Sequence, residues 1–436
     1  MGAKACLIVA AALGMGCGTG SSTQGIDGNS DTGGSQGSGG AGGLGGMTTA
    51  RTGGGDGRAT GGARGGTGGK ATGGGTGQGG QGGAAGGGGT VSAGNPSGSC
   101  SAGVPARGQP VDTSTPTSKI GTGTPESCDF GQLATAVAKG GIITFDCGVA
   151  AHTVTVTATL KLPINKNTII DGGGRITLDG AGAVQIMRFD GTDWMKNANT
   201  VTLQHITLMG GKTTPSEAIP TAPSPCSQGY NDGEGGAVYV RDGNLVVIDA
   251  IFINNQAAPL GPDTGGGAIY INGSKDGVLI VGSSFVGNKA SNAGAVGCLF
   301  AELDVYNSLF QNNQAIGHDA NNDDATKCSA INNGQHEIGS GGNGGALYND
   351  GASKNITLCG NAILNNAAGQ NAFGGGLFFT SNDFGGTLTV VDTTMTGNTG
   401  GSWTQVSGGS VTNAGTAVGT NAKSITITSS TLQGVK

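Results

Sequence analysis

The sequence is poor in charge and in aromatic side chains, which make up 11% and 4% of its 436 residues. The formal net charge is −6. Residues 1–17 and residues 18–99 each carry a net charge of +1, so residues from 100 onward carry −8. Proteins that bind nucleic acid or anionic lipid need clustered Lys and Arg to neutralise phosphates. We therefore expect no nucleic-acid partner, and an anionic polysaccharide would be repelled unless calcium intervened.

Long apolar runs and helical patterns are scarce as well. No apolar stripe of helical period extends to a useful length after about residue 140, which argues against an α-helical solenoid. The first apolar run, Ala5 to Leu13, is too short to span a membrane but suits an export signal. Small residues before Cys17 resemble the cleavage box of bacterial lipoproteins. We predict a signal over residues 1–17 with Cys17 acylated, the alternative being an ordinary cleaved signal.

Glycine occurs 94 times and dominates residues 18–99, together with Ser, Thr, Ala and Gln. Nothing in that segment can bury a hydrophobic core, so we expect a disordered spacer there and a folded domain over residues 100–436. A signal, an acylated cysteine, a spacer and a folded domain, in that order, are typical of a protein displayed on the cell envelope or extracellular surface. Contact with the membrane is then expected through the lipid anchor only.

Two short steps recur along the folded part, which indicates a repeat architecture. The first is Gly-Gly-Ala-apolar or a close variant, found at Gly235–Val238, Gly266–Ile269, Ala293–Val296, Gly344–Leu347 and Gly374–Leu377. The second is apolar-x-x-Asn, found at Phe252–Asn255, Phe285–Asn288, Phe310–Asn313, Ile363–Asn366 and Met395–Asn398. Equivalent steps lie 25 to 33 residues apart, except across one longer gap after Phe310. That gap fits a normal repeat with a long loop, or a degenerate coil plus a loop.

Short apolar segments near the steps, such as Leu245–Ile248 and Val278–Val281, are rich in β-branched residues and bounded by Gly, Asn or Asp. They predict strands between turns, and the period fits one coil of a solenoid. The glycines suit sharp corners, and the Phe, Ile or Met of the second step should enter the core. We predict that the stacked Asn side chains form an amide ladder, the alternative being a ligand-binding row. The Asn residues are Asn255, Asn288, Asn313, Asn366 and Asn398.

At these steps the chain resembles the repeats of chlamydial polymorphic outer-membrane proteins, which combine Gly-Gly-Ala-(Ile/Leu/Val) with Phe-x-x-Asn. Through Thr168–Gly180 and Val201–Leu208 it also resembles the wider class of bacterial right-handed parallel β-helix, or pectin-lyase-like, proteins. The repeats are clearest over residues 235–398, and two of the Asn steps lack Phe. The resemblance implies an all-β fold, a right-handed parallel β-helix of about ten coils. It implies no particular activity.

A short helical stretch begins at Cys128 and places Phe130, Leu133 and Val137 on one face. We expect this helix, at about residues 128–140, to cap the open first coil of the solenoid.

Export permits disulfides. Cys147 ends the first clear strand, so a Cys128–Cys147 bond would join the cap to the coil. Cys226 and Cys328 lie in long polar insertions and are predicted to pair. Cys298 and Cys359 lie in or beside apolar strands, where we expect buried free thiols.

Two polar insertions, residues 212–234 and 314–342, are where chemistry could reside, because repeat proteins commonly display functional groups from loops. The second insertion holds the candidate catalytic residues, His318, Asp319, Asp323, Asp324 and His336. Carboxylates and histidines suit acid–base chemistry. Calcium is the one metal this loop could hold, although its spacing departs from the helix-loop-helix calcium pattern. A solvated polar loop is the default interpretation, and no other cofactor or metal is expected.

No nucleophile triad, phosphate loop, dinucleotide fingerprint or zinc spacing stands out in the sequence. We therefore expect a monomeric, non-enzymatic adhesion or structural module that presents a rigid β-helix to a cell-surface glycan or protein. The alternative is a polysaccharide lyase or glycoside hydrolase of the same fold. A third reading is a fragment of a longer autotransporter.

Overall fold

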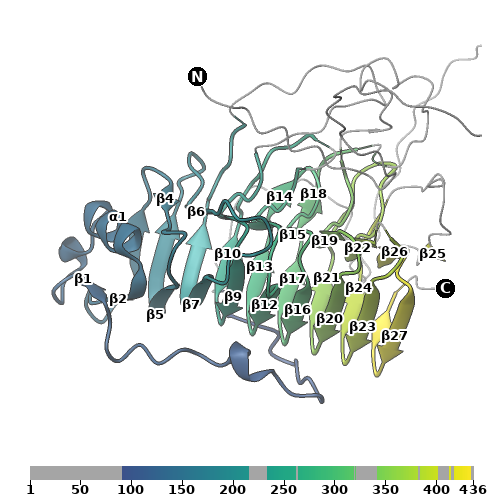
Figure 1. Ribbon diagram of the computed structural model, residues 1–436, viewed down its shortest axis with the longest axis horizontal. Coiled ribbons are helices and arrows are strands. Elements are labelled where there is room, and N and C mark those ends of the chain that lie inside the picture. The colour runs from purple at the N-terminus through teal and green to yellow at the C-terminus, as the bar shows by residue number, and fades with distance from the viewer. Residues whose placement is uncertain are drawn as a thin grey trace, which may run out of the picture. The chain divides into compact units, whose positions relative to one another are not determined.

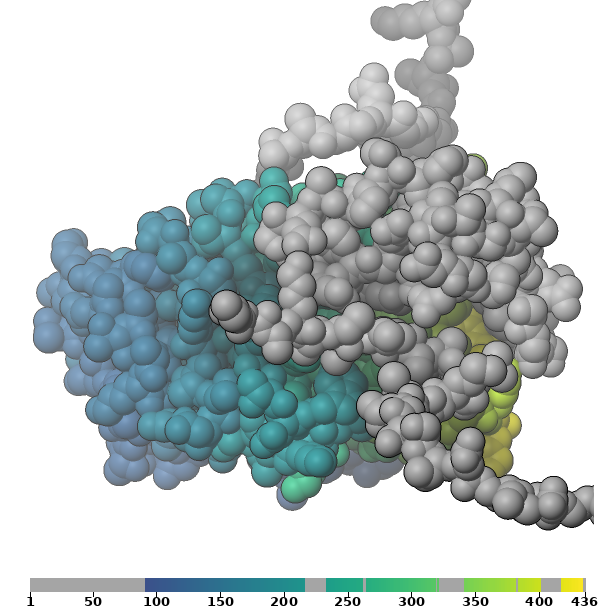
Figure 2. Space-filling view, turned by 45° about the horizontal axis from the view of Figure 1, so that its top comes forward, coloured from purple at the N-terminus to yellow at the C-terminus, as the bar shows by residue number. Residues whose placement is uncertain are grey.

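The computed structural model describes residues 91–215, 233–261, 264–318, 320, 341–381, 383–400, 412–413 and 417–433. These residues form a parallel β-helix, which confirms the all-β solenoid predicted from the repeats. The chain coils so that each strand lies beside the equivalent strand of the next coil (Figure 1). In the space-filling view the colour changes steadily along the described part, as expected when successive coils stack (Figure 2).

One flank of the solenoid is a ladder of parallel strands that we call the first strip. In pairing order its ten strands are β1 (Ser118–Ile120), β2 (Gly141–Phe145), β5 (Thr168–Asp179), β7 (Thr200–Met209), β9 (Asn244–Ile248), β12 (Val278–Val281), β16 (Leu303–Tyr306), β20 (Asn355–Cys359), β23 (Thr387–Val391) and β27 (Ser424–Thr428). Equivalent positions pair in register, so that Val278 lies between Leu245 and Leu303. Neighbouring rungs are therefore separated by the ordinary strand spacing of about 4.8 Å.

From β7 onward, the chain leaves each strand of the first strip through a single residue with positive φ, and these residues form a line that we call the bend row. Its members are His205, Asp249, Gly282, Asn307, Gly360, Asp392 and Ser429. Their φ values lie between 46° and 71°. Gly, Asn and Asp tolerate this left-handed conformation best, which explains the residue types found at five of the seven positions.

After the bend row, the chain enters a second strip of shorter strands in the same sheet. The second strip contains β3 (His152–Thr155), the ends of β5 and β7, β10 (Ile251–Ile253), β13 (Ser284–Val286), β17 (Leu309–Gln311), β21 (Ala362–Leu364), β24 (Thr394–Thr396) and β28 (Thr431–Leu432).

A separate sheet closes each coil. It contains β4 (Leu160–Lys161), β6 (Met187–Asp190), β8 (Val238–Arg241), β11 (Ile269–Asn272), β15 (Val296–Leu299), β19 (Leu347–Asp350), β22 (Leu377–Thr380), β26 (Val418–Thr420) and the antiparallel β25 (Thr412–Asn413). A two-stranded ladder of β14 (Lys289–Ala290) and β18 (Gln314–Ala315) completes the described strands.

The long gap in the repeat adds no rung between the described strands on either side of it. β19 pairs directly with β15, and β20 pairs directly with β16, so the residues between β18 and β19 are inserted within one coil. Of the two accounts of this gap that the sequence left open, a normal repeat with a long loop is therefore the right one.

The glycine steps form corners where successive coils touch. Gly266 and Gly344 have φ values of 71° and 72°. A Cβ added to Gly294, the second residue of its step, would lie 2.1 Å from the carbonyl oxygen of Gly345 in the next coil. Glycine is required there because no side chain fits between the two backbones.

The Asn steps form a continuous amide ladder in the interior. Each of the first four Asn donates from both its backbone N–H and its side-chain amide to the side-chain oxygen of the next Asn, at 2.9–3.0 Å. The five Asn side chains are buried, at 0–3% exposure. Beside them the rings of Phe252, Phe285 and Phe310 stack at 4.7 Å. The ladder is thus enclosed in the structure and its oxygens are occupied.

The first coil is covered by the helix α1 (Phe130–Lys139), close to the expected cap. Asp129 caps its first turn by accepting from the N–H of Gln132 at 2.9 Å. Leu133 and Val137 are fully buried and Phe130 is partly buried against the core. Cys128 forms a disulfide with Cys147 in the structure, which joins this helix to the coil beneath it.

The remaining described cysteines require one correction. Cys298 is free and buried, whereas Cys359, which we expected to be a free thiol, is bonded to Cys100. The sequence pattern around Cys359 suggested an inward-facing residue, but position 359 is the last of β20, beside the bend row, where a chain outside the solenoid can reach it. Cys226 and Cys328 lie outside the described residues.

The described residues begin at 91, ahead of the expected boundary between spacer and folded domain at residue 100. Residues 91–117 form an extended segment, which we call the strap, along the outer face of the first strip; it includes the short helix η1 (Ala106–Gly108). In Figure 1 the strap is the blue chain that runs along the lower edge of the strands. Asn95, within the expected spacer, already bonds to the backbone of Asn307 and Gly360. A second short helix, η2 (Pro125–Ser127), precedes α1.

Candidate ligand-binding flank

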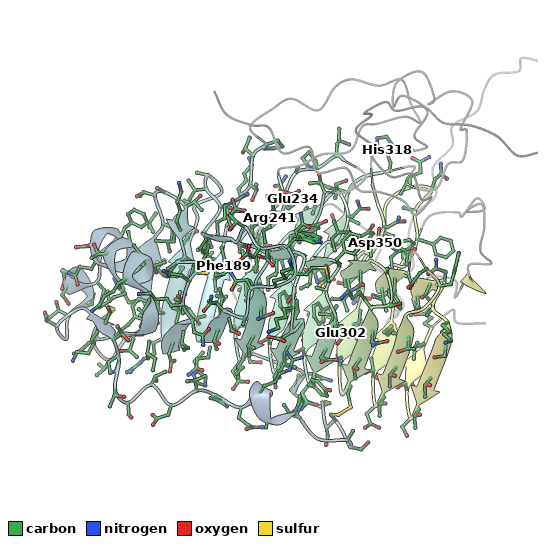
Figure 3. All side chains as sticks on the ribbon, in the orientation of Figure 1. Phe189, Glu234, Arg241, Glu302, His318 and Asp350 are labelled. Carbon is green, nitrogen blue, oxygen red and sulfur yellow. A yellow bond between two sulfur atoms is a disulfide. The ribbon has the colours of Figure 1, made fainter. Side chains whose placement is uncertain are left out.

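The candidate catalytic residues from the second polar insertion fall mostly outside the described chain. His318 follows β18 and is partly exposed, on the side of the solenoid that carries Glu234 and away from Glu302 (Figure 3). Asp319, Asp323, Asp324 and His336 are not among the described residues. Their convergence on a groove, which would favour an enzyme, therefore stays a prediction.

Within the ranges that the structure describes, no three His, Cys, Asp or Glu side chains gather closely enough to hold a metal ion. Asp319 and Asp323, the carboxylates of the calcium loop considered in the sequence, lie outside those ranges. Among the same described residues, no helix is both long and apolar enough to cross a bilayer.

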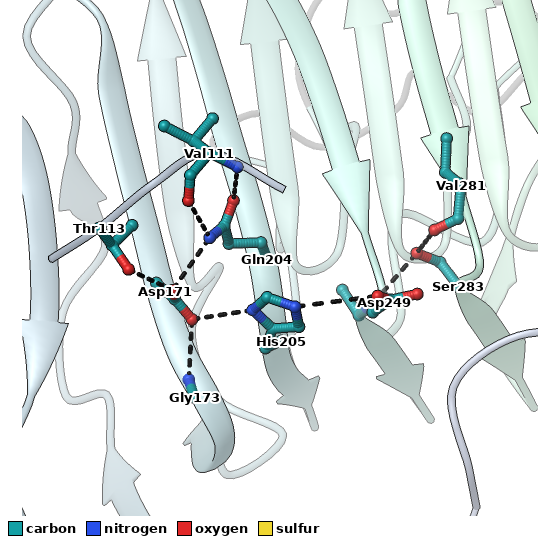
Figure 4. A network of polar contacts seen from close by, with 10 residues as sticks. Val111, Thr113, Asp171, Gly173, Gln204, His205, Asp249, Val281 and Ser283 are labelled. Carbon is teal, nitrogen blue, oxygen red and sulfur yellow. Dashed lines mark hydrogen bonds and ion pairs between the residues drawn. The ribbon is translucent and has the colours of Figure 1, made fainter. Parts of the chain in front are cut away.

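A polar network on the outer flank does bring chemically useful groups together, at the point where β5, β7 and the strap meet (Figure 4). Its centre is the carboxylate of Asp171, whose side chain is 12% exposed. It accepts hydrogen bonds from Thr113 Oγ1 at 2.7 Å, Gln204 Nε2 at 2.9 Å and the N–H of Gly173 at 2.9 Å. His205 Nδ1 lies 3.1 Å from Oδ1 of the same carboxylate. Asp171 therefore holds the strap and the bend row together.

The network defines how His205 is oriented. An ionised carboxylate can only accept, so the proton of neutral His205 resides on Nδ1, facing Asp171. The other ring nitrogen, Nε2, lies 3.8 Å from Oδ2 of Asp249 in the next coil. His205 thus stands between a carboxylate of the preceding rung and one of the following rung, with its side chain one-third exposed.

The two carboxylates have opposite pKa shifts. Burial alone would raise the pKa of Asp171, but the hydrogen bonds from Gly173, Thr113, Gln204 and His205 together outweigh it and lower the pKa below 3.8. Burial raises the pKa of Asp249, and attraction to His205 only partly offsets that effect. Asp171 is therefore an anchored structural carboxylate, and Asp249 is the weaker acid of the pair, which takes up a proton first as the pH falls.

A small cavity of about 180 Å³ opens next to this network. Its lining includes the hydroxyl-bearing Thr113 and Thr144, the ring of Phe145, Asp171 and Arg175. Arg175 is exposed and makes no ion pair with any described residue. The hydroxyls and a guanidinium with open donors can hydrogen-bond a polar ligand, and the aromatic ring can pack against it.

Little in the sequence points to this site. His205 and Asp171 each lie within a strand-like segment, Val201–Leu208 and Thr168–Gly180, and no motif singles out either residue. The register of the coils is the signal that could have identified the site. When the coils are aligned, Asp171 pairs with Gln204, and His205 is the next residue along the chain. The strap residue Thr113 offers no such signal, because nothing in its surroundings repeats.

Comparison with known proteins bears on the repeats alone. The model of the Chlamydia polymorphic membrane protein repeat matches residues 249–272 and 307–350. Each matched range contains one Asn step followed by one glycine step. Comparisons with curated proteins and with solved structures gave no match. The chain is thus a parallel β-helix with repeats similar to those of the Chlamydia proteins.

Proposed function

We propose that this protein is an exported adhesion module of a bacterial envelope, which presents the flank of its β-helix to a cell-surface glycan or protein. The observation that carries the proposal is the match of two coils to a repeat of membrane proteins. The disulfides Cys100–Cys359 and Cys128–Cys147 support export, because disulfides persist in oxidising compartments and are rare in the cytosol.

The contact surface that we propose is the outer flank around the cavity lined by Arg175, Thr113 and Phe145. A rigid solenoid holds such groups at fixed spacing, so several weak contacts along one face can add up to useful avidity. Because fold alone does not define function, this role depends on the site and needs a direct test.

The test is binding of the full chain, as a monomer, to an array of glycans and host-surface proteins, with and without calcium. We expect binding that falls at least several-fold in Arg175→Ala. The matched control is Lys161→Ala, which removes an exposed positive charge in β4 of the other sheet. Equal binding by both variants would remove Arg175 from the contact surface, and the absence of any bound component would contradict adhesion.

The enzyme alternative is separated by incubating the same protein with the glycans and measuring reducing ends and unsaturated products. Turnover that disappears in Asp323→Ala would replace adhesion by polysaccharide cleavage. Membrane attachment is tested separately: metabolic labelling with a fatty-acid analogue should mark the wild-type chain and fail to mark Cys17→Ser. Labelling of both proteins, or of neither, would contradict the anchor.

A further inference from the structure

The strap follows a folded-back path over the flank of the solenoid. It enters beside β13, where Ser92 accepts a hydrogen bond from Ser284 at 2.7 Å, and reaches the C-terminal coils, where Ser101 bonds to Asp392 at 2.8 Å. It then returns across β16, where Arg107 pairs with Asp304, and reaches Asp171 through Thr113. The segment thus touches most of the rungs before it becomes β1.

One disulfide joins the strap to the solenoid near the point where the strap reverses direction. Cys100 is joined to Cys359, the last residue of β20, across 259 positions of sequence. Cys359 is 1% exposed, and the backbone N–H of Cys100 donates to the side chain of Asn307 at 2.9 Å. β20 pairs with β16 on one side and with β23 on the other. The attachment point is therefore in the interior of the ladder, away from the capped first coil.

We propose that the strap and the Cys100–Cys359 disulfide form a force clamp, which transfers tension from the preceding chain directly to β20 and keeps it off the first coils. A covalent bond between residues 100 and 359 shields every residue between them from tension applied outside the pair. This inference goes beyond adhesion, because it holds whatever the partner is.

The contacts of the strap show what the disulfide prevents. Without it, tension at residue 100 would load the contacts of Arg107, Val111 and Thr113 one after another. Each consists of one or two exposed or half-buried bonds, so the strap would unzip at low force. The pull would then reach β1, a three-residue edge strand, and the helix α1. Coils would peel away from that end.

With the disulfide intact, the pull enters at Cys359 instead. There it meets the five-residue pairing of β20 with β23, the four-residue pairing with β16 and the amide of Asn366, all of which resist together. Bonds that share a load in parallel resist more force than bonds that break in sequence. The clamp thus places the load where the ladder is continuous on both sides.

The experiment is optical-trap pulling of the full chain between handles at its two ends, without reductant. The wild type should show no extension from residues 101–358. Cys359→Ser should begin to yield at lower force in several small steps, and should lengthen by several hundred ångströms more, since an extended chain spans about 3.4 Å per residue. Cys128→Ser is the matched control: its loop lies inside the shielded region, so its extension should equal that of the wild type.

A second measurement guards against misfolding of the serine variant. A single wild-type molecule is held at low load and then exposed to a phosphine reductant, and we expect the extra extension only after reduction. Wild type that extends as far as Cys359→Ser without reductant would overturn the clamp. So would a variant that yields at the same force as the wild type, since the disulfide would then carry no load.

Discussion

Asn288 directs two N–H donors to one atom of the next coil: its side-chain amide and its backbone N–H lie 2.9 and 3.0 Å from Oδ1 of Asn313. Both residues are fully buried. A buried donor without a partner costs more than an ordinary hydrogen bond contributes. The Asn step is therefore a condition for stacking one coil on the next.

Replacing Asn313 by Ala should destabilise the solenoid by about 2 to 4 kcal/mol, because two donors of Asn288 and the carbonyl of Phe285 lose their partner. The measurement is the midpoint of urea unfolding. The neighbouring exposed side chain of Gln314 provides the control, since Gln314→Ala should change stability by less than about 0.5 kcal/mol. Similar midpoints for the two variants would show that the ladder does not stabilise the fold.

The glycine steps should be equally intolerant of a side chain. Gly294→Ala would place Cβ 2.1 Å from the carbonyl oxygen of Gly345, so the coils would have to separate, and we expect a loss of stability or of soluble expression. Gly131→Ala, in α1, should be neutral or stabilising by up to about 1 kcal/mol, since Ala favours helix. Thermal unfolding of both variants checks this, and a tolerated Gly294→Ala would contradict the close packing of the corners.

The aromatic stack should contribute through packing. Phe285 lies between Phe252 and Phe310 at 4.7 Å on either side and is fully buried. Phe285→Ala should cost about 3 to 5 kcal/mol, and Phe285→Leu should cost less because it leaves a smaller cavity. Equilibrium unfolding of the two variants should preserve that order, whereas equal losses would indicate that the site collapses around the smaller side chain.

The carboxylates of the flank should give opposite pH dependences. The lowered pKa of Asp171 means that its ionised form stabilises the fold above pH 3.8 and that this contribution is lost as the pH falls through the lowered value. The raised pKa of Asp249 means that stability falls as the pH rises from 3.8 through the raised value.

Asp171→Asn should therefore reduce the loss of stability on acidification, and Asp249→Asn should increase it, because its opposing contribution disappears. Urea unfolding at a series of acidic pH values measures both slopes. If both substitutions change the slope in the same direction, the proposed environments of the two carboxylates are wrong.

The disulfides give a prediction that mass spectrometry can read directly. Trypsin without reductant should leave peptide 71–107 joined to peptide 355–423, and peptide 120–139 joined to peptide 140–161. The same digest tests the predicted Cys226–Cys328 pair, which would join peptides 213–241 and 328–354. Cys298 should be alkylated only after unfolding, because it is buried and burial raises the pKa of its thiol.

The repeated features of the fold could be predicted from the sequence because they depend on local residue types. The glycine corners, the Phe and Asn steps and the cap helix each require particular side chains at a fixed spacing. A second ladder of hydrogen bonds could not be predicted, because its positions do not share one residue type. It follows the bend row and bonds Ser283, Ser308, Asn361, Thr393 and Ser430 from coil to coil. Three different residue types share its role, so no repeated letter marks it.

The strap and the flank site could not be predicted because their contacts are long-range and occur once. Cys100 lies in a Gly- and Ser-rich context that resembles the spacer, and its partner is 259 positions away. Thr113 and Asp171 are likewise brought together by the returning path of the strap. The composition of a segment indicates whether that segment can form a hydrophobic core by itself. It does not indicate whether the segment packs on a core formed by the rest of the chain.

The register of the coils is the claim on which the rest depends, and cysteine crosslinking tests it most directly. Lys289 and Gln314 are exposed partners in β14 and β18. Adjacent strands are about 4.8 Å apart, within the reach of a disulfide. Lys289→Cys with Gln314→Cys should crosslink rapidly under mild oxidation, and Lys289→Cys with Asn312→Cys, two positions out of register, should crosslink poorly. Equal or reversed yields would contradict the stacked parallel coils.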